Sequence, residues 1–213
     1  MKIDKSAMLL YAVTDRTWLN GEPLESAVEK VLAAGVTFLQ LREKDLTDAA
    51  FLAEAEKIKL IAQKHNVPFV INDNVEVAIK CGADGVHVGQ SDIMDRDIRA
   101  LIGPDKILGI SANTVETAKR AEISGANYIG VGAVFNTATK KDAQAISVER
   151  LREICDAVSI PVVAIGGISE NNILQLQGSG IDGVAVISAI FAKLDPAAAT
   201  AALLELSKKV VSG

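Results

Sequence analysis

The sequence predicts an α/β fold, a (β/α)8 TIM barrel built from residues 1–213 as a single domain. Three observations lead to this prediction. Short apolar runs alternate with longer amphipathic ones, one glycine pattern recurs four times, and 213 residues suit eight β-α units with little else. No shift in composition marks a linker, so we expect one domain.

Eight short apolar runs are the expected strands. Each is nearly continuous in hydrophobicity and rich in β-branched residues, as parallel strands are when both their faces are covered. In chain order they are Leu9–Val13, Val36–Leu41, Pro68–Ile71, Gly85–Val88, Lys106–Ile110, Tyr128–Val131, Pro161–Ile165 and Gly183–Ile187. Helical patterns separate them, such as Asp48–His65, where the apolar residues fall on one stripe.

A repeated lead-in supports the number of strands. A helix-ending glycine, two connecting residues and then a strand occur at Gly35, Gly82, Gly125 and Gly180. Glycine suits the left-handed position that ends a helix. The intervals of 47, 43 and 55 residues are each about the length of two β-α units, so the four lead-ins imply eight strands.

An open doubly wound sheet is the rival fold. It would carry a glycine-rich nucleotide fingerprint between its first strand and first helix. The formal match at Gly178, Gly180 and Gly183 runs from a helix end into a strand, which is the reverse order. We therefore interpret this match as coincidental.

Composition excludes several classes of partner. Lys and Arg number 22 against 27 Asp and Glu, a net charge of −5, and aromatic residues make up 4% of the chain. These values predict no nucleic-acid partner. The longest uncharged run, 123–139, is too short for a membrane helix. We therefore expect no membrane association. Cys81 and Cys155 form no CxxC pair, so we expect reduced thiols and a cytoplasmic location.

Polar residues gather where the expected strands end, which is where barrels of this class carry their functional sites. Gln40, Arg42 and Lys44 alternate along an extended segment and are expected to point the same way, toward an anion. Lys140, preceded by Thr137 and Thr139, adds an ammonium and hydroxyl groups suited to phosphate oxygens. The alternative interpretation of both segments is a solvated surface.

Asp73 and Asp92 follow successive strands and are expected to converge. Two carboxylates together with water and substrate phosphates suit Mg²⁺. The alternative role for each aspartate is to cap the helix that follows it. A second anion site, for a monophosphate, is predicted at the glycine-rich turn 164–169 and at Ser188, because the loops after the seventh and eighth strands commonly bind phosphate.

No nucleophile with an adjacent base is evident in the sequence. His65 falls on a helix outside the barrel, and His87 lies within the fourth strand, where a core or barrel-lining position is expected. A site rich in cations and poor in bases suits the departure of a phosphate-type leaving group, which electrostatic stabilisation alone can assist.

An ordered set of motifs, spread from the first expected strand to the loop after the seventh, resembles the thiamine phosphate synthase family. The set comprises Leu10-Tyr11-x-Val13-Thr14-Asp15, Gln40-Leu41-Arg42-x-Lys44, Asn72-Asp73, Gly85-Val86-His87-Val88-Gly89-Gln90-x-Asp92, Gly109-Ile110-Ser111, Thr137-x-Thr139-Lys140-Lys141 and Gly166-Gly167-Ile168. The family has the barrel fold. Its members join hydroxymethylpyrimidine diphosphate to hydroxyethylthiazole phosphate, forming thiamine phosphate and releasing pyrophosphate.

The resemblance implies roles for individual residues. Those that would hold the pyrimidine diphosphate are Gln40, Leu41, Arg42, Glu43, Lys44, Asn72, Ser111 and Lys140. Among them Arg42, Lys44, Ser111 and Lys140 would be catalytic, and Asp73 and Asp92 would bind Mg²⁺ as the cofactor. Those that would hold the thiazole phosphate are Thr137, Ala138, Thr139, Gly167, Ile187 and Ser188. Ala138 and Asn136 depart from the commonest residues of the family without removing a charged contact.

Two other functions remain open. A thiazole tautomerase-like isomerase of the same fold would need a proton-transfer base and no metal cluster. A non-catalytic sensor of phosphate ligands would not require the paired aspartates. The expected partners are small-molecule substrates, and the sequence leaves the oligomeric state open, a homo-oligomer included.

Overall fold

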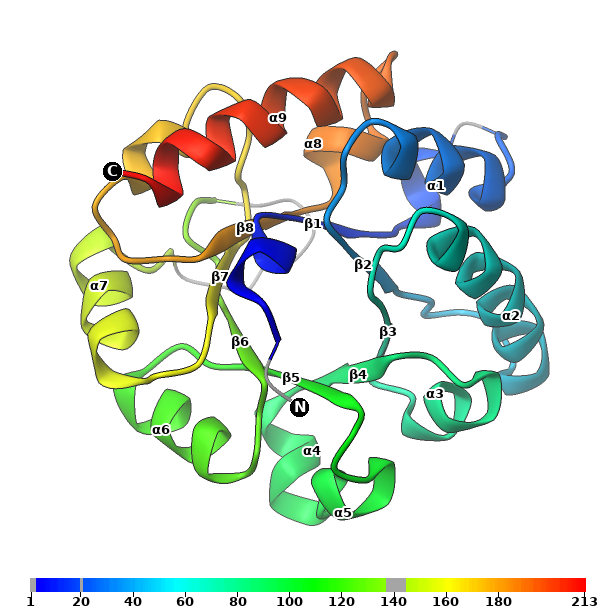
Figure 1. Cartoon of the computed structure of the whole chain (residues 1–213), viewed down its shortest axis with the longest axis horizontal. Coiled ribbons are helices and arrows are strands. Elements are labelled where there is room, and N and C mark those ends of the chain that lie inside the picture. The colour runs from blue at the N-terminus through cyan, green and yellow to red at the C-terminus, as the bar shows by residue number, and fades with distance from the viewer. Residues whose placement is uncertain (1–2, 20, 137–144) are drawn as a thin grey trace.

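Eight parallel strands close into a barrel in the order β1-β2-β3-β4-β5-β6-β7-β8 (Figure 1). The computed structural model describes residues 3–19, 21–136 and 145–213. The strands are β1 (Leu10–Val13), β2 (Phe38–Leu41), β3 (Phe69–Asn72), β4 (Gly85–Val88), β5 (Ile107–Ser111), β6 (Tyr128–Val131), β7 (Val162–Ile165) and β8 (Gly183–Val186). The predicted (β/α)8 barrel is confirmed, and each predicted strand matches an observed one to within two residues at either end.

Helices surround the barrel (Figure 1). They are α1 (Leu24–Ala33), α2 (Asp48–Lys64), α3 (Val75–Cys81), α4 (Gln90–Asp95), α5 (Ile98–Ile102), α6 (Val115–Ile123), α7 (Val148–Ala157), α8 (Ser188–Phe191) and α9 (Pro196–Val211), with the 3-10 helices η1 (Lys5–Met8), η2 (Arg16–Trp18) and η3 (Ile173–Leu176). Between β7 and β8 the chain forms η3 in place of an α-helix. Side chains that accept a backbone N–H at the N-cap fix where several of them begin, namely Thr47, Asn74, Thr114, Ser147 and Asp195. Along the described ranges, none of these helices has the length and hydrophobicity needed to cross a membrane.

Alternation along each strand produces two separate cores. One set of side chains, including Leu39, Ile71 and Ile129, faces the helices and joins the large outer core. The other set faces the barrel axis and forms a smaller inner core that includes Phe38 and Tyr128. Successive strand residues point to opposite faces, so every strand except β4 contributes to both cores. β4 adds Val86 and Val88 to the outer core, and its inward residue His87 lines the cavity described below.

The amino-terminal mouth of the barrel is closed by the segment that precedes β1. Met8, at the end of η1, is fully buried and belongs to the inner core, and Ile3 and Ala7 pack against that core. In Figure 1 this segment crosses the barrel opening near the viewer. The inner cavity is therefore left to the opposite, carboxyl-terminal mouth.

The four glycine lead-ins share a hydrogen bond that joins neighbouring strands at the amino-terminal face. Two residues after each glycine, a polar side chain accepts the N–H of the first or second residue of the preceding strand. The four contacts, which we call the strand clamps, are Thr37 Oγ1 with Leu10 N at 2.8 Å, Asp84 Oδ2 with Phe69 N at 2.8 Å, Asn127 Oδ1 with Leu108 N at 2.8 Å, and Asp182 Oδ2 with Val162 N at 2.9 Å. The repeat in the sequence thus marks a repeated contact as well as helix ends.

Candidate active site

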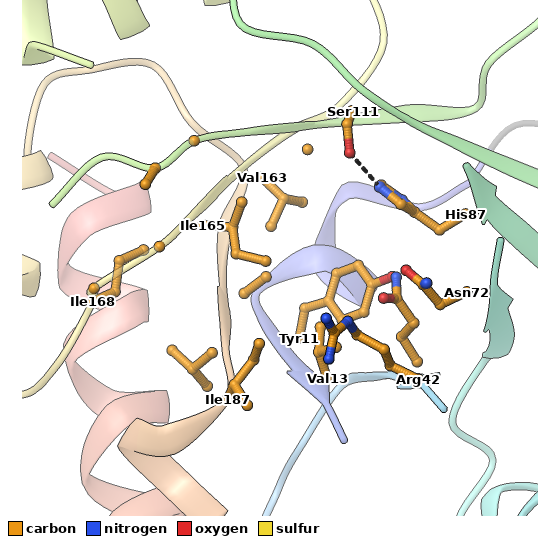
Figure 2. A pocket seen from close by; sticks show the side chains of 18 of the residues that line it. Tyr11, Val13, Arg42, Asn72, His87, Ser111, Val163, Ile165, Ile168 and Ile187 are labelled. Atoms are coloured by element: carbon orange, nitrogen blue, oxygen red, sulfur yellow. Dashed lines mark hydrogen bonds between the residues drawn. The ribbon is translucent and has the colours of Figure 1, made fainter. Parts of the chain in front are cut away.

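A cavity of about 180 Å³ lies at the carboxyl ends of the strands (Figure 2). Residues from every strand or from the loop after it line this cavity. They are Tyr11, Val13, Gln40, Arg42, Asn72, His87, Ser111, Asn113, Gly130, Gly132, Ala133, Val163, Ile165, Gly166, Gly167, Ile168, Ala185, Val186, Ile187 and Ser188. The cavity therefore lies where the barrel fold is expected to carry its chemistry.

The cavity has a polar side and an apolar side. β2 to β5 and the loops after them supply the polar side, with Arg42, Asn72 and Ser111, and β7, β8 and their loops supply aliphatic side chains such as Ile165 and Ile187. Figure 2 shows Ile168 and Ile187 on one side of the cavity and Arg42, Asn72 and His87 on the other. Such a cavity suits a ligand with a charged part and a flat, largely apolar part.

Arg42 supplies a positive charge to the polar side. Its backbone N–H donates to the buried hydroxyl of Thr14 over 3.0 Å, which fixes the chain directly after β2. Its guanidinium Nη1 lies 3.5 Å from Asp15 Oδ2, and the side chain is 16% exposed. Within the described part of the chain this long ion pair is the one recorded for Arg42, and it leaves guanidinium N–H groups for a second anion.

Hydrogen bonds link the floor of the cavity across the barrel interior. Gln40 Nε2 donates to the Tyr11 hydroxyl over 2.6 Å, and the hydroxyls of Tyr11 and Tyr128 lie 2.8 Å apart. His87 contacts the Tyr128 hydroxyl through Nδ1 at 2.9 Å and Ser111 Oγ through Nε2 at 3.0 Å. Burial raises the pKa of both tyrosines far above neutrality, so both phenols carry their protons.

A glycine-rich turn after β7 forms the opposite edge of the cavity. Gly166 and Gly167 have φ angles of 101° and 68°, and a Cβ on Gly167 would lie 2.8 Å from the Phe135 side chain. The turn is braced by Asn172, whose side chain accepts from Ser169 N at 2.8 Å and donates to Gly167 O at 2.9 Å. Glycine is thus required here, and the backbone of the turn is open to the cavity.

Asp73 and Asp92 follow the neighbouring strands β3 and β4, as expected. Asp73 is exposed, has φ of 61°, and accepts from Asn72 Nδ2 at 2.7 Å. It does not cap α3, since Asn74 does. Asp92 accepts from Gly89 N at 2.8 Å at the start of α4. The alternative prediction for Asp92, that it caps the helix, is therefore confirmed.

The carboxylate oxygens of Asp73 and Asp92 are the groups predicted to bind Mg²⁺. Among the described residues no group of three or more His, Cys, Asp or Glu side chains could hold a metal ion. Asp73, directly after β3, and Asp92, in the first turn of α4 after β4, are nonetheless hard oxygen donors of the kind that Mg²⁺ shares with water and substrate phosphates. The residues therefore fit Mg²⁺ better than a metal that needs a complete protein cage.

Three residues assigned to substrate by the resemblance have side chains that are not among those lining the cavity. Leu41 is fully buried in the outer core, because alternation turns it away from the axis. Glu43 Oε1 accepts from Arg16 Nε at 2.8 Å. Lys44 is exposed and lies beyond the end of β2, where the chain bends, so the alternation that places Gln40 and Arg42 inward does not reach it.

Seven assigned residues do line the cavity, namely Gln40, Arg42, Asn72, Ser111, Gly167, Ile187 and Ser188. Thr137, Ala138, Thr139 and Lys140 lie outside the described residues, so their assignments stay predictions. His65 lies outside the barrel and contacts Glu29 Oε1 at 2.9 Å, and His87 lines the barrel, as the sequence indicated.

Sequence reasoning missed part of the cavity lining. Tyr11, Val163 and Ala185 lie inside strands rather than after them. They were not predicted, because only polar residues directly after each strand were considered. The signal that could have found them is alternation, since Tyr11 and Val13 share the inward face of β1 and Val163 and Ile165 share that of β7.

Comparisons with known proteins show the family to which the chain belongs. The family model described as thiamine monophosphate synthase matches residues 10–190. The thiamine-phosphate synthase of Clostridium tetani is 50% identical over 87% of this chain and 89% of its own, and that of Ruminiclostridium cellulolyticum is 50% identical over 92% and 94%. In structure, the chain is similar to thiamine phosphate pyrophosphorylase from Pyrococcus furiosus, with a TM-score of 0.88, 35% identity, and coverage of 97% of this chain and 98% of that one.

Proposed function

The chain belongs to the thiamine monophosphate synthase family, and we propose that it joins hydroxymethylpyrimidine diphosphate to hydroxyethylthiazole phosphate, releasing pyrophosphate. One observation carries this proposal beyond the family. A single cavity places a guanidinium and amide groups opposite a glycine-rich turn, with apolar surface nearby. Two phosphate-bearing substrates with flat rings fit such an arrangement.

The polar side of the cavity would hold the pyrimidine diphosphate. Gln40, Asn72 and Ser111 supply hydrogen-bonding groups and Arg42 supplies charge, with Lys44 and Lys140 completing the positive field. Leu41 and Glu43 would contribute only backbone, because their side chains are engaged elsewhere. These cations stabilise charge as it develops on the departing pyrophosphate.

The glycine-rich side would hold the thiazole phosphate. Gly167 and Ser188 lie after β7 and β8, and Ser188 opens α8, where N–H groups lie outside the helical hydrogen-bond ladder. Ile187 would pack on the thiazole ring, and Thr137, Ala138 and Thr139, which lie outside the described residues, stay assigned to this substrate by the resemblance. Backbone N–H groups bind a monophosphate without adding net positive charge.

The reaction needs charge stabilisation rather than a base. The electrons of the C–O bond leave with pyrophosphate, and the resulting pyrimidine-stabilised cation accepts the lone pair of the thiazole nitrogen to form the C–N bond. Asp73 and Asp92 would hold Mg²⁺, which when bound neutralises the charge of the diphosphate. A tautomerase would instead need a free base, and the imidazole that lines the cavity, His87, has both nitrogens in hydrogen bonds.

Reconstitution tests the proposal. Purified protein with both substrates and Mg²⁺ should yield thiamine phosphate and pyrophosphate in equal amounts, measured by chromatography and a coupled pyrophosphate assay. EDTA should abolish turnover while leaving the melting temperature unchanged, since no described element depends on a metal. Asp73→Asn should raise the Mg²⁺ concentration needed for half-maximal rate about tenfold or more.

Folded protein that forms no thiamine phosphate under these conditions would rule out the proposed reaction. Asp95→Asn, in an exposed carboxylate at the end of α4, is the matched control and should leave the Mg²⁺ titration unchanged. We also propose a cytoplasmic location, because both cysteines are free thiols.

A further inference from the structure

Four consecutive hydrogen bonds run through the barrel interior beneath the cavity. They join Gln40 Nε2 to the hydroxyl of Tyr11, then the hydroxyl of Tyr128, then His87 Nδ1, and finally His87 Nε2 to Ser111 Oγ. The chain thus connects β2, β1, β6, β4 and β5, and its two ends are cavity residues assigned to the pyrimidine diphosphate. We call these five residues the interior chain.

The barrel is shaped to hold this chain. A Cβ at Gly109 would lie 2.5 Å from His87 Nδ1, and one at Gly130 would lie 3.2 Å from the same ring, so glycines on β5 and β6 leave room for the imidazole. The Tyr128 ring packs edge-on against Tyr11 and Phe38, with centroids 5.8 and 5.5 Å away. Both phenols are almost completely buried, so each must place its hydrogen on a protein acceptor.

The donors along the interior chain can run in one direction. A side-chain amide nitrogen only donates, so the Tyr11 oxygen accepts from Gln40. The Tyr11 and Tyr128 oxygens lie 2.8 Å apart, and either hydroxyl could donate across this distance. Because the Tyr11 oxygen already accepts from Gln40, and Tyr128 is the partner left for the Tyr11 hydrogen among the described residues, we assign that hydrogen to the Tyr128 oxygen. The Tyr128 hydrogen then points to His87 Nδ1, which must be unprotonated, and the Nε2–H donates to Ser111 Oγ.

We propose that Tyr128 is a positioning residue that fixes His87 as its neutral Nε2–H tautomer and thereby turns the Ser111 hydroxyl hydrogen toward the cavity. Ser111 Oγ already accepts from the imidazole, and within the described residues its hydroxyl has no other recorded partner, so its own hydrogen can donate to an acceptor atom of the bound ligand. The inference rests on the proposed function in one respect, that this ligand is the pyrimidine diphosphate. The tautomer itself is a property of the free protein.

NMR of the imidazole nitrogens tests the tautomer directly. The chain has two histidines, so ¹⁵N-histidine labelling in a His65→Gln background leaves the signals of His87 alone. At neutral pH the parent should show Nδ1 unprotonated and Nε2 protonated. Tyr128→Phe should replace this single tautomer with a mixture, because Nδ1 loses its donor. Tyr11→Phe, the matched control, should keep the parent tautomer, because the Tyr128 hydroxyl still reaches Nδ1.

Kinetics test the link to Ser111. Tyr128→Phe should lower kcat/KM about five- to tenfold, as expected for one lost hydrogen bond. In a Ser111→Ala background the same change should have less than about a twofold effect, since the group that Tyr128 positions is already absent. Independent effects in this double-mutant cycle would refute the positioning role.

A His87 found as the Nδ1–H tautomer in the parent would overturn the proposal, and this measurement needs no variant of the interior chain. If Tyr128→Phe left the single tautomer intact, the proposal would be equally wrong. Failure of the proposed function looks different, because the parent would then form no thiamine phosphate while the tautomer result still stood.

Discussion

Gly167 shows how one residue combines backbone and site requirements. Its φ of 68° lies in the left-handed region, and a Cβ would lie 2.8 Å from both the Cβ and the carbonyl oxygen of Phe135. Gly167→Ala should therefore cost about 1–2 kcal/mol of strain and displace the turn. We expect KM for the thiazole phosphate to rise about tenfold or more.

Steady-state kinetics and urea unfolding check this expectation. Gly103→Ala is the matched control, because Gly103 has φ of 81° and a Cβ there would meet no other atom within 4 Å. It should lose about 1–3 kcal/mol of stability, because φ of 81° with ψ of 171° is a conformation almost restricted to glycine, and it should keep the parent KM. Equal KM values for Gly167→Ala and the parent would remove the turn from the substrate site.

Glu43 makes stability depend on pH in an unusual direction. Its side chain is 4% exposed, and burial raises its carboxyl pKa above the ordinary value of 4.5 even though Arg16 opposes the shift. A raised pKa contributes stability that is complete below pH 4.5 and is lost as the pH rises through the folded-state pKa. Glu43→Gln removes this dependence.

The free energy of unfolding of the parent, relative to Glu43→Gln, should thus fall between pH 4.5 and neutrality. Urea titrations of both proteins across that range measure it. Glu22→Gln is the comparison with the opposite sign, because hydrogen bonds from Lys30 and Ser26 lower the pKa of Glu22. The parent should lose stability relative to Glu22→Gln only as the pH falls below 4.5. Parallel pH profiles for parent and Glu43→Gln would contradict the shift.

The sequence predicts single residues best where alternation holds. Gln40 and Arg42 are inward and Leu41 is outward in one strand, as a period of two requires. Lys44 was expected to continue the series, but a bend after the strand ends it. The partner of Glu43, Arg16, comes from a different loop, and no local pattern reveals such a pair.

At the scale of elements, the strand clamps explain why the glycine lead-ins recur. Asp182 accepts the N–H of Val162 at 2.9 Å and its other oxygen lies 2.7 Å from Lys5 Nζ. Asp182→Ala would leave a buried N–H without an acceptor and should cost about 1–3 kcal/mol. Because the clamp lies at the amino-terminal face, kcat should not change.

Asp182→Asn separates the clamp from the ion pair. Asparagine keeps an acceptor oxygen for Val162, and the lost pair involves the largely exposed Lys5, so this variant should lose less than about 1 kcal/mol. Urea unfolding and kcat for both variants test the assignment. A loss as large for asparagine as for alanine would show that charge, not the N–H acceptor, matters here.

Element positions were largely predictable because hydrophobic runs and caps are local signals. The main surprise is after β7, where η3 stands in place of the expected helix. The residues there, Ile173 and Leu176, are buried apolar residues of a short turn, and their spacing alone does not distinguish one turn of 3-10 helix from a longer helix.

At the scale of the whole molecule, the two ends of the barrel have different tasks. The clamps and the buried Met8 hold the amino-terminal face, whereas the cavity opens at the other. Closure of eight strands into a barrel could be predicted from their number and from the repeat. The interior chain could not be predicted, because it joins residues on five strands, and which residues face one another across the barrel depends on the stagger of the strands.

The strand clamps also bear on how the chain reaches its folded state. Their partners are 27, 15, 19 and 20 residues apart, so each clamp closes a short loop and joins strands that follow one another in sequence. Contacts between residues close in sequence form quickly, because little chain entropy is lost in closing them. Four strand pairs can therefore assemble independently during folding, and pairing of β8 with β1, which joins the two ends of the chain, is left as the slow final step.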